Sequence, residues 1–171
     1  MRALVDALES NPSAGVAFGT VDCIGPDVKT RTDYRRWFDW AARAASKVRW
    51  SKRLTVAVIM FRGTVIINSC CAIRREAALE LGGYDPAIPV YEDVEFFTRG
   101  IRRFGHVFVE DPVLEYQTGM PSIIHDLDGD STKVHESYEI MHSKYKDAHG
   151  PIEYRAMQVI GKVVPLPTMA A

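Results

Sequence analysis

The chain has 171 residues, of which 47% are hydrophobic and 25% are charged, a composition typical of a folded globular domain and not of a disordered segment. Its formal net charge of −1 provides no basic field for nucleic acid or for an anionic membrane surface. The longest apolar runs are far shorter than a membrane span, and the N-terminus does not resemble a signal peptide, so we expect neither a transmembrane segment nor secretion.

The first half of the chain alternates between helical and extended patterns. Apolar residues recur at a helical period over residues 2–10 and 32–48. Residues 15–24 form a β-type run between turn residues. Two further runs, 54–61 and 64–73, are rich in β-branched residues, and we predict that both are extended.

A short helix followed by a longer amphipathic helix is predicted in the middle of the chain. We expect residues 74–81 to be helical and to end at Gly82, because glycine takes the left-handed position after a helix at least cost. Apolar residues then recur every three or four positions over residues 92–104, and Gly105 supplies the end of that helix.

The last third begins with a strand and ends with helices. Residues 106–116 are strand-like despite Pro112, and residues 119–130 read as a polar loop. Helices are predicted over residues 132–147 and 152–163. Because strands and helices alternate along the whole chain, the predicted fold class is α/β.

The three cysteines favour a reducing compartment. Their number is odd and Cys70 and Cys71 are adjacent, a pattern that disfavours a disulfide framework. No Cys and His spacing resembles a zinc site, so we interpret the cysteines as small buried hydrophobic residues.

Two adjacent acids, Glu92 and Asp93, stand where the helix over residues 92–104 should begin. Negative side chains in a first helical turn complement the helix dipole, which is the ordinary structural interpretation. A helix N-terminus also holds a carboxylate rigidly and keeps it ionised, as a catalytic base requires. Position alone does not decide between these roles, and one carboxylate can fill both.

The ordered series from residue 72 to residue 105 resembles the C-terminal half of family-2 glycosyltransferases. A basic pair and a short helix precede Gly82-Gly83-Tyr84-Asp85, and Glu92-Asp93 then opens a helix that carries Arg99. The flanking segments, residues 3–19 and 108–122, also look like the corresponding helix and strands of that family. The resemblance covers roughly residues 1–125.

The resemblance implies a partial fold of the GT-A type, which is related to the Rossmann fold. We expect a mixed sheet flanked by helices that corresponds to the acceptor-side half and lacks the N-terminal nucleotide-binding half. Residues 1–125 would form this half, and residues 126–171 would be a helical C-terminal extension.

The same resemblance implies inverting transfer of a sugar from a nucleotide-diphosphate sugar to an acceptor hydroxyl. Asp93 would act as general base, and Glu92 would orient the acceptor or the Asp93 backbone. Arg99 would bind substrate, although pairing with Glu95 one helical turn away is an alternative. The remaining substrate-binding candidates are Gly82, Gly83, Tyr84 and Asp85.

Members of this family usually use a divalent metal, Mn²⁺ or Mg²⁺. Their Asp-X-Asp ligands would precede Arg2 and therefore fall outside this chain. His125 is the nearest candidate for a further ligand, and an exposed loop histidine without metal is the alternative. A metal-dependent hydrolase is a separate hypothesis, supported only by the density of possible ligands, His125, Asp126, Asp128 and Asp130.

The implied partners are a nucleotide sugar and a glycan or lipid-linked acceptor, without nucleic acid. We expect a cytoplasmic protein, either free or peripheral at the inner membrane face. A half-fold would expose a sheet edge, which predicts a homodimer through that edge. The alternative function is a non-catalytic module that binds a partner or a glycan.

Overall fold

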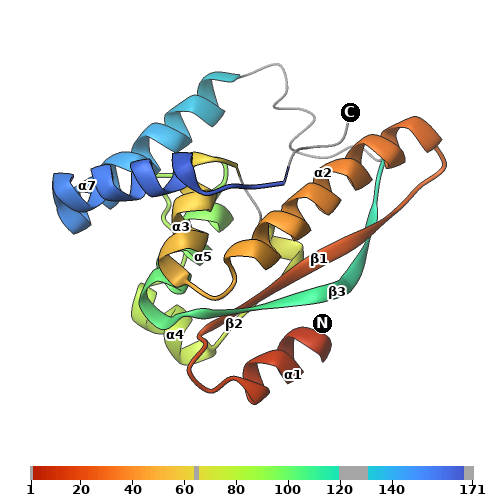
Figure 1. The fold of residues 1–171 in the computed structure, drawn as a ribbon, viewed down its shortest axis with the longest axis horizontal. Coiled ribbons are helices and arrows are strands. Elements are labelled where there is room, and N and C mark those ends of the chain that lie inside the picture. The colour runs from red at the N-terminus through yellow and green to blue at the C-terminus, as the bar shows by residue number, and fades with distance from the viewer. Residues whose placement is uncertain (1, 64–65, 120–130, 168–171) are drawn as a thin grey trace.

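The computed structural model describes residues 2–63, 66–119 and 131–167, which form a small mixed sheet with helices packed on both faces (Figure 1). The predicted α/β class is therefore confirmed. Along the chain the elements are α1 (Arg2–Ser10), β1 (Val16–Ile24), α2 (Val28–Val48), α3 (Lys52–Phe61), the 3₁₀ turn η1 (Asn68–Cys70), β2 (Cys71–Ile73), α4 (Arg75–Leu81), α5 (Glu92–Phe104), β3 (His106–Gln117) and α7 (Ser131–Val163).

The sheet has the strand order β2-β1-β3. β1 pairs antiparallel with β2 and parallel with β3. The β1–β3 register shifts on both sides of Thr20, whose partner is Pro112. Proline cannot donate a ladder hydrogen bond, and an irregularity on an edge strand accommodates it. The predicted strand over residues 106–116 is thus confirmed with Pro112 inside it.

The two faces of the sheet are covered by different helices. On one face Leu4 and Leu8 of α1 pack against Ala17 of β1. On the other face Val16 and Phe18 of β1 belong to a larger core that helices α2, α3, α5 and α7 complete. Figure 1 shows α1 on its own side of the sheet, opposite α2.

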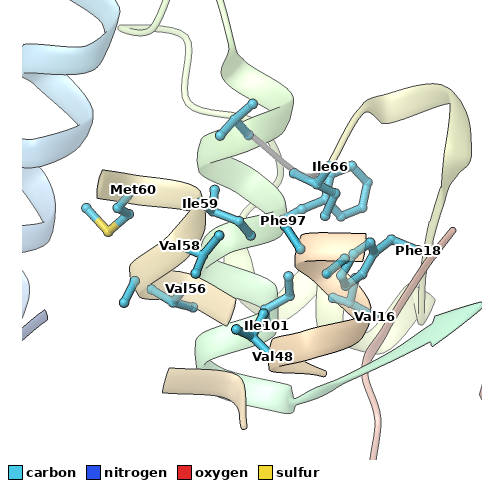
Figure 2. Close-up of a cluster of buried hydrophobic side chains, with 14 of the residues drawn as sticks. Val16, Phe18, Val48, Val56, Val58, Ile59, Met60, Ile66, Phe97 and Ile101 are labelled. Carbon is cyan, nitrogen blue, oxygen red and sulfur yellow. The ribbon is translucent and has the colours of Figure 1, made fainter. Parts of the chain in front are cut away.

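The larger core draws on almost every element. In Figure 2, Val56, Val58 and Ile59 of α3 meet Ile101 of α5 beside the strand residues, and each of these four side chains is fully buried. Met60 extends from the same helix toward α7 (Figure 2). The contributions of α7 to this core are Met141, Tyr145 and Met157.

α7 consists of two helical segments, as the sequence predicted. Gly150 has φ 84° and ψ 161°, which are not helical values, and Pro151 follows it. The segments contact each other, because the Tyr154 hydroxyl lies 3.1 Å from Nδ1 of His142. A glycine followed by a proline is a strong helix break, and here it lets the chain turn back.

The extended prediction for residues 54–61 was wrong, because this segment is helix α3. All residues from Thr55 to Met60 are buried, so the polar face that would reveal a helical period is missing. Without a visible period, the β-branched composition alone favoured a strand in the sequence-based prediction. The helix begins at a capping residue, because the Ser51 hydroxyl accepts a hydrogen bond from the Leu54 N–H at 3.4 Å.

The prediction for residues 64–73 was mostly wrong. Residues 64 and 65 lie outside the described residues, Asn68–Cys70 is a 3₁₀ turn, and only Cys71–Ile73 is a strand. The predicted burial of the cysteines is confirmed for all three. The helix predicted over residues 32–48 is also confirmed, although it begins four residues earlier, at Val28.

The outer edges of β2 and β3 have no strand partner within the described part of the chain. The β3 edge carries Pro112 and the exposed acids Glu110 and Asp111, features that discourage pairing with another chain. The predicted homodimer therefore stays a prediction. Among the described helices, none is long and apolar enough to cross a membrane.

Candidate functional site

The first turn of α5 has an unusual start. Tyr91, the residue before the helix, has φ 61° and ψ 27°, a left-handed conformation that is uncommon for a bulky residue. Its side chain provides no capping hydrogen bond. Glu92, Asp93 and Glu95 make the first turn acidic, which favours the helix dipole.

Asp93 is held in place by backbone N–H groups on two sides. Its Oδ2 accepts a hydrogen bond from the N–H of Asn68 at 2.9 Å, and its Oδ1 accepts one from the N–H of Val94 at 2.7 Å. The side chain is partly buried, so it is neither enclosed in the core nor directed freely into solvent. The carboxylate therefore has a fixed position and remains partly accessible.

Tyr84 connects the Gly82–Asp85 loop to this carboxylate. Its hydroxyl donates to Oδ1 of Asn68 at 3.1 Å, so Tyr84 and Asp93 bind the same residue. Its ring packs on Phe96 with centroids 4.6 Å apart. Burial raises the pKa of Tyr84, and the nearby negative charge of Asp93 raises it further. Two segments of the predicted site thus meet at η1.

Two further neighbours of Asp93, Cys71 and Tyr138, have raised pKa values and are uncharged at neutral pH. Burial raises the pKa of the Cys71 thiol well above its usual value, and Cys70 and Asp93 add to this effect. Burial also raises the pKa of Tyr138, with smaller contributions from Tyr91 and Asp93. Within the described residues Asp93 has no ion-pair partner.

α7 fixes the loop that leads into α5. The Ser137 hydroxyl accepts a hydrogen bond from the Val90 N–H at 3.1 Å, and Ser137 is only 1% exposed. The ring of Tyr138 lies 5.4 Å from that of Tyr91. Lys144 forms an ion pair with Asp85. The C-terminal helix therefore helps to hold the left-handed turn that precedes the two acids.

Arg99 pairs with Glu95, the alternative considered for it from the sequence. Nε of Arg99 lies 2.5 Å from Oε1 of Glu95, and Nη2 lies 2.9 Å from Oε2. The same guanidinium donates to the carbonyl oxygens of Leu81 and Gly83, both at 2.8 Å. The pair is not a surface contact, because the Glu95 side chain is only 7% exposed. Arg99 thus anchors the end of α4 to α5.

A pocket lies beside this ion pair, between α5 and the first segment of α7. It has a volume of about 510 Å³ and is called the α5–α7 pocket below. Glu92 and Asp93 are not among its lining residues. All five predicted substrate-binding residues, Gly82, Gly83, Tyr84, Asp85 and Arg99, line it. The predicted site residues therefore divide between two places, which Tyr84 connects.

The two glycines that line the pocket serve the end of α4. Gly82 has φ 77° and Gly83 has φ 78°, so both occupy the left-handed region that favours glycine. The Gly83 N–H donates to the Ala78 carbonyl at 3.2 Å. The predicted helix end at Gly82 is confirmed.

No metal centre is formed by the residues that the structure describes. They contain no group of three or more His, Cys, Asp or Glu side chains that could hold an ion. The predicted ligand His125 lies outside the described residues, as do Asp126, Asp128 and Asp130 of the hydrolase hypothesis.

Asn68 is the site residue that sequence reasoning missed. Its N–H binds Asp93 and its side-chain oxygen binds Tyr84, yet it is 25 residues from Asp93 in the chain. An asparagine before a serine and two cysteines carries no local signal of such a role. Only the fold brings it to the start of α5.

The chain was compared with protein-family models, with curated proteins and with solved structures, and none of the three comparisons found a match.

Proposed function

We propose that this chain is the acceptor side of an inverting glycosyltransferase with a GT-A-type fold, and that Asp93 is its general base. The observation that carries the proposal is the position of Asp93. Its carboxylate is held by the N–H groups of Asn68 and Val94, lacks a cationic partner in the described residues, and lies next to the Gly82–Asp85 loop.

The proposed reaction is a single displacement. The acceptor oxygen forms a bond to the anomeric carbon of a nucleotide-diphosphate sugar. The bond from that carbon to the diphosphate oxygen breaks, and its electron pair leaves with the nucleoside diphosphate. Asp93 takes the proton of the acceptor hydroxyl during the attack. Attack on the face opposite the leaving group inverts the anomeric configuration.

The remaining parts of the proposal follow from the family resemblance. Glu92, the first residue of α5, would orient the acceptor. The acceptor would be a glycan or a lipid-linked glycan, and the enzyme would act in the cytoplasm or at the inner membrane face. Mn²⁺ or Mg²⁺ would neutralise the leaving diphosphate, with ligands other than the described residues.

One observation favours a second candidate, a non-catalytic module that binds a partner or a glycan. Both carboxylate oxygens of Asp93 already accept backbone hydrogen bonds, as a purely structural first-turn acid would. Each oxygen retains a further lone pair, so these bonds permit proton transfer without requiring it. The assay below separates the two candidates.

The test is release of nucleoside diphosphate from UDP-glucose, UDP-N-acetylglucosamine and GDP-mannose, each with Mn²⁺ and a panel of oligosaccharide acceptors. Donors are used at millimolar concentration, so that transfer from a weakly bound donor is also detected. We expect acceptor-dependent release by the wild type and a loss of at least about a hundredfold in Asp93→Asn. Glu92→Gln serves as the neighbouring control and should lose less.

Two results would count against the proposal. A wild-type chain that transfers no sugar from any donor would favour the non-catalytic module. An Asp93→Asn variant that transfers at a rate near that of the wild type would remove Asp93 from the role of base.

A further inference from the structure

Two residues that line the α5–α7 pocket have buried hydroxyl groups without hydrogen-bond partners among the described residues. Thr98 on α5 is 4% exposed and Tyr145 on α7 is 8% exposed, and both residues line the pocket. Neither hydroxyl oxygen has a partner within the part of the chain that the structure describes. A buried hydroxyl without a partner is costly and rare in native proteins, so these two groups require a partner that the described residues do not supply.

The walls of the pocket are mainly apolar. Met60 comes from α3, Leu81 from α4 and Met141 from α7. The Tyr145 ring adds an aromatic surface, with the His149 ring 4.5 Å from it. The volume of about 510 Å³ lies within the range of roughly 300–1,000 Å³ typical of small-molecule sites.

Three of the four cations around the pocket have a carboxylate partner of their own, and the fourth, Arg102, shares Glu153 with Arg53. Arg99 pairs with Glu95, Lys144 with Asp85, Arg103 with Glu80, and Arg102 with Glu153. An anionic ligand would have to compete with these carboxylates for each of the four cations. A neutral ligand leaves all four intact.

We infer that the α5–α7 pocket binds a compact, uncharged molecule with an apolar or aromatic body and at least one oxygen that accepts a hydrogen bond from Thr98 or Tyr145. The body would contact the methionine and leucine side chains, and the oxygen would satisfy the orphan hydroxyls. Burial raises the pKa of Tyr145, so its phenol stays protonated and remains a donor at neutral pH.

This inference does not depend on the proposed glycosyl transfer. Asp93 does not line the pocket, and the site would exist in a non-catalytic module as well. Tyr84 lines the pocket and also contacts Asn68 beside Asp93. We therefore expect ligand binding to affect the conformation at the start of α5.

The experiment uses three probes that share one carbon body: 4-propylphenol, propylbenzene and the anion 4-propylbenzoate. Binding is followed by NMR of ¹³C-labelled methionine methyl groups in the whole chain. Met60 and Met141 report from the pocket, and the fully buried Met157, which does not line it, reports on the fold. We expect saturable shifts at both pocket methionines with 4-propylphenol. Propylbenzene should bind roughly three- to tenfold more weakly, because it lacks the oxygen, and 4-propylbenzoate should bind weakest.

Two variants test the assigned groups. The double variant Thr98→Val and Tyr145→Phe removes both hydroxyls with little change in shape, and it should bind 4-propylphenol and propylbenzene equally well. Ala148→Trp, at an exposed position that lines the pocket, should abolish binding of both while the Met157 signal stays unchanged. The inference is overturned by absence of saturable binding of any probe to the wild type, by a preference for phenol that survives the double variant, or by tightest binding of the benzoate.

Discussion

Asp93 and Glu95 are two carboxylates in the first turn of the same helix, and their surroundings differ completely. Glu95 is buried and paired with Arg99, whose guanidinium also binds two carbonyl oxygens at the end of α4. Asp93 is partly exposed, accepts only backbone N–H groups, and has no cationic partner within residues 2–63, 66–119 and 131–167.

The partner of a charged side chain in a first helical turn decides which roles are open to it. A carboxylate fixed by a guanidinium cannot accept a proton without disrupting the fold. A carboxylate fixed by neutral donors has no counter-charge to lose, and each of its oxygens retains a further lone pair. Glu95 therefore has a structural role, and the proposed function gives Asp93 the chemical one.

The largest expected effect on stability is at Glu95. Glu95→Gln leaves the Arg99 guanidinium partly buried without its counter-charge, and we expect the free energy of unfolding to fall by about 3 kcal/mol. Urea denaturation measures this change. Glu76→Gln, at an exposed position in α4, is the control and should stay within about 0.5 kcal/mol. If Glu95→Gln lowered the free energy of unfolding by less than about 1 kcal/mol, Glu95 would be no more important for stability than Asp93.

The next prediction concerns the pH dependence of folding stability. Stability and activity must be measured separately at low pH, because acid can unfold the protein as well as protonate a catalytic group. Burial lowers the pKa of His106 to about 4, and its Nε2 lies 3.1 Å from the Thr55 hydroxyl. The unfolded chain takes up this proton near pH 6.5. The contribution of His106 is therefore fully present above pH 6.5 and is lost as the pH falls toward 4, by roughly 3 kcal/mol in total.

His106→Gln should remove that part of the pH dependence while an amide still reaches Thr55. The measurement is the urea midpoint of both proteins between pH 4 and pH 8. An equally steep decline in the variant would mean that His106 is not the group responsible.

Asp93 itself is expected to matter little for stability. Asp93→Asn keeps an oxygen that can accept one of the two backbone N–H groups, so we expect a loss of at most about 1 kcal/mol. Thermal or urea unfolding gives the value. A loss of about 3 kcal/mol or more would make Asp93 as structural as Glu95.

The smallest effect is expected at the rim of the α5–α7 pocket. The Lys144 side chain is 47% exposed in its ion pair with Asp85, so Lys144→Met should change stability by less than about 1 kcal/mol. The difference should shrink further in 1 M salt. A larger loss that persists in high salt would show that this pair is needed to hold α7 on the loop.

Sequence patterns predicted the helix that carries both carboxylates. Val94, Phe97 and Ile101 recur at a helical period, and all three are buried, because α5 presents one face to the core. Its end at Gly105 and the end of α4 at Gly82 were also predicted, since glycine is required by a local backbone geometry. Signals of this kind depend only on neighbours in the chain.

The surroundings of the two carboxylates could not be predicted in this way. Asn68 reaches Asp93 only because residues 68–70 form a 3₁₀ turn beside α5, in a segment whose composition favours strand. Helix α3 was missed because burial on all sides removes its period. The α5–α7 pocket likewise depends on where the C-terminal helix packs, and no local pattern encodes that.

The most direct test of the central claim is the rate of acceptor-dependent sugar transfer by Asp93→Asn, measured on protein whose folded fraction has been established by urea unfolding. We predict that Asp93→Asn transfers sugar at least about a hundredfold more slowly than the wild type. Its free energy of unfolding should stay within about 1 kcal/mol of the wild-type value. A rate within threefold of the wild type in a folded variant would contradict the assignment of Asp93 as the base.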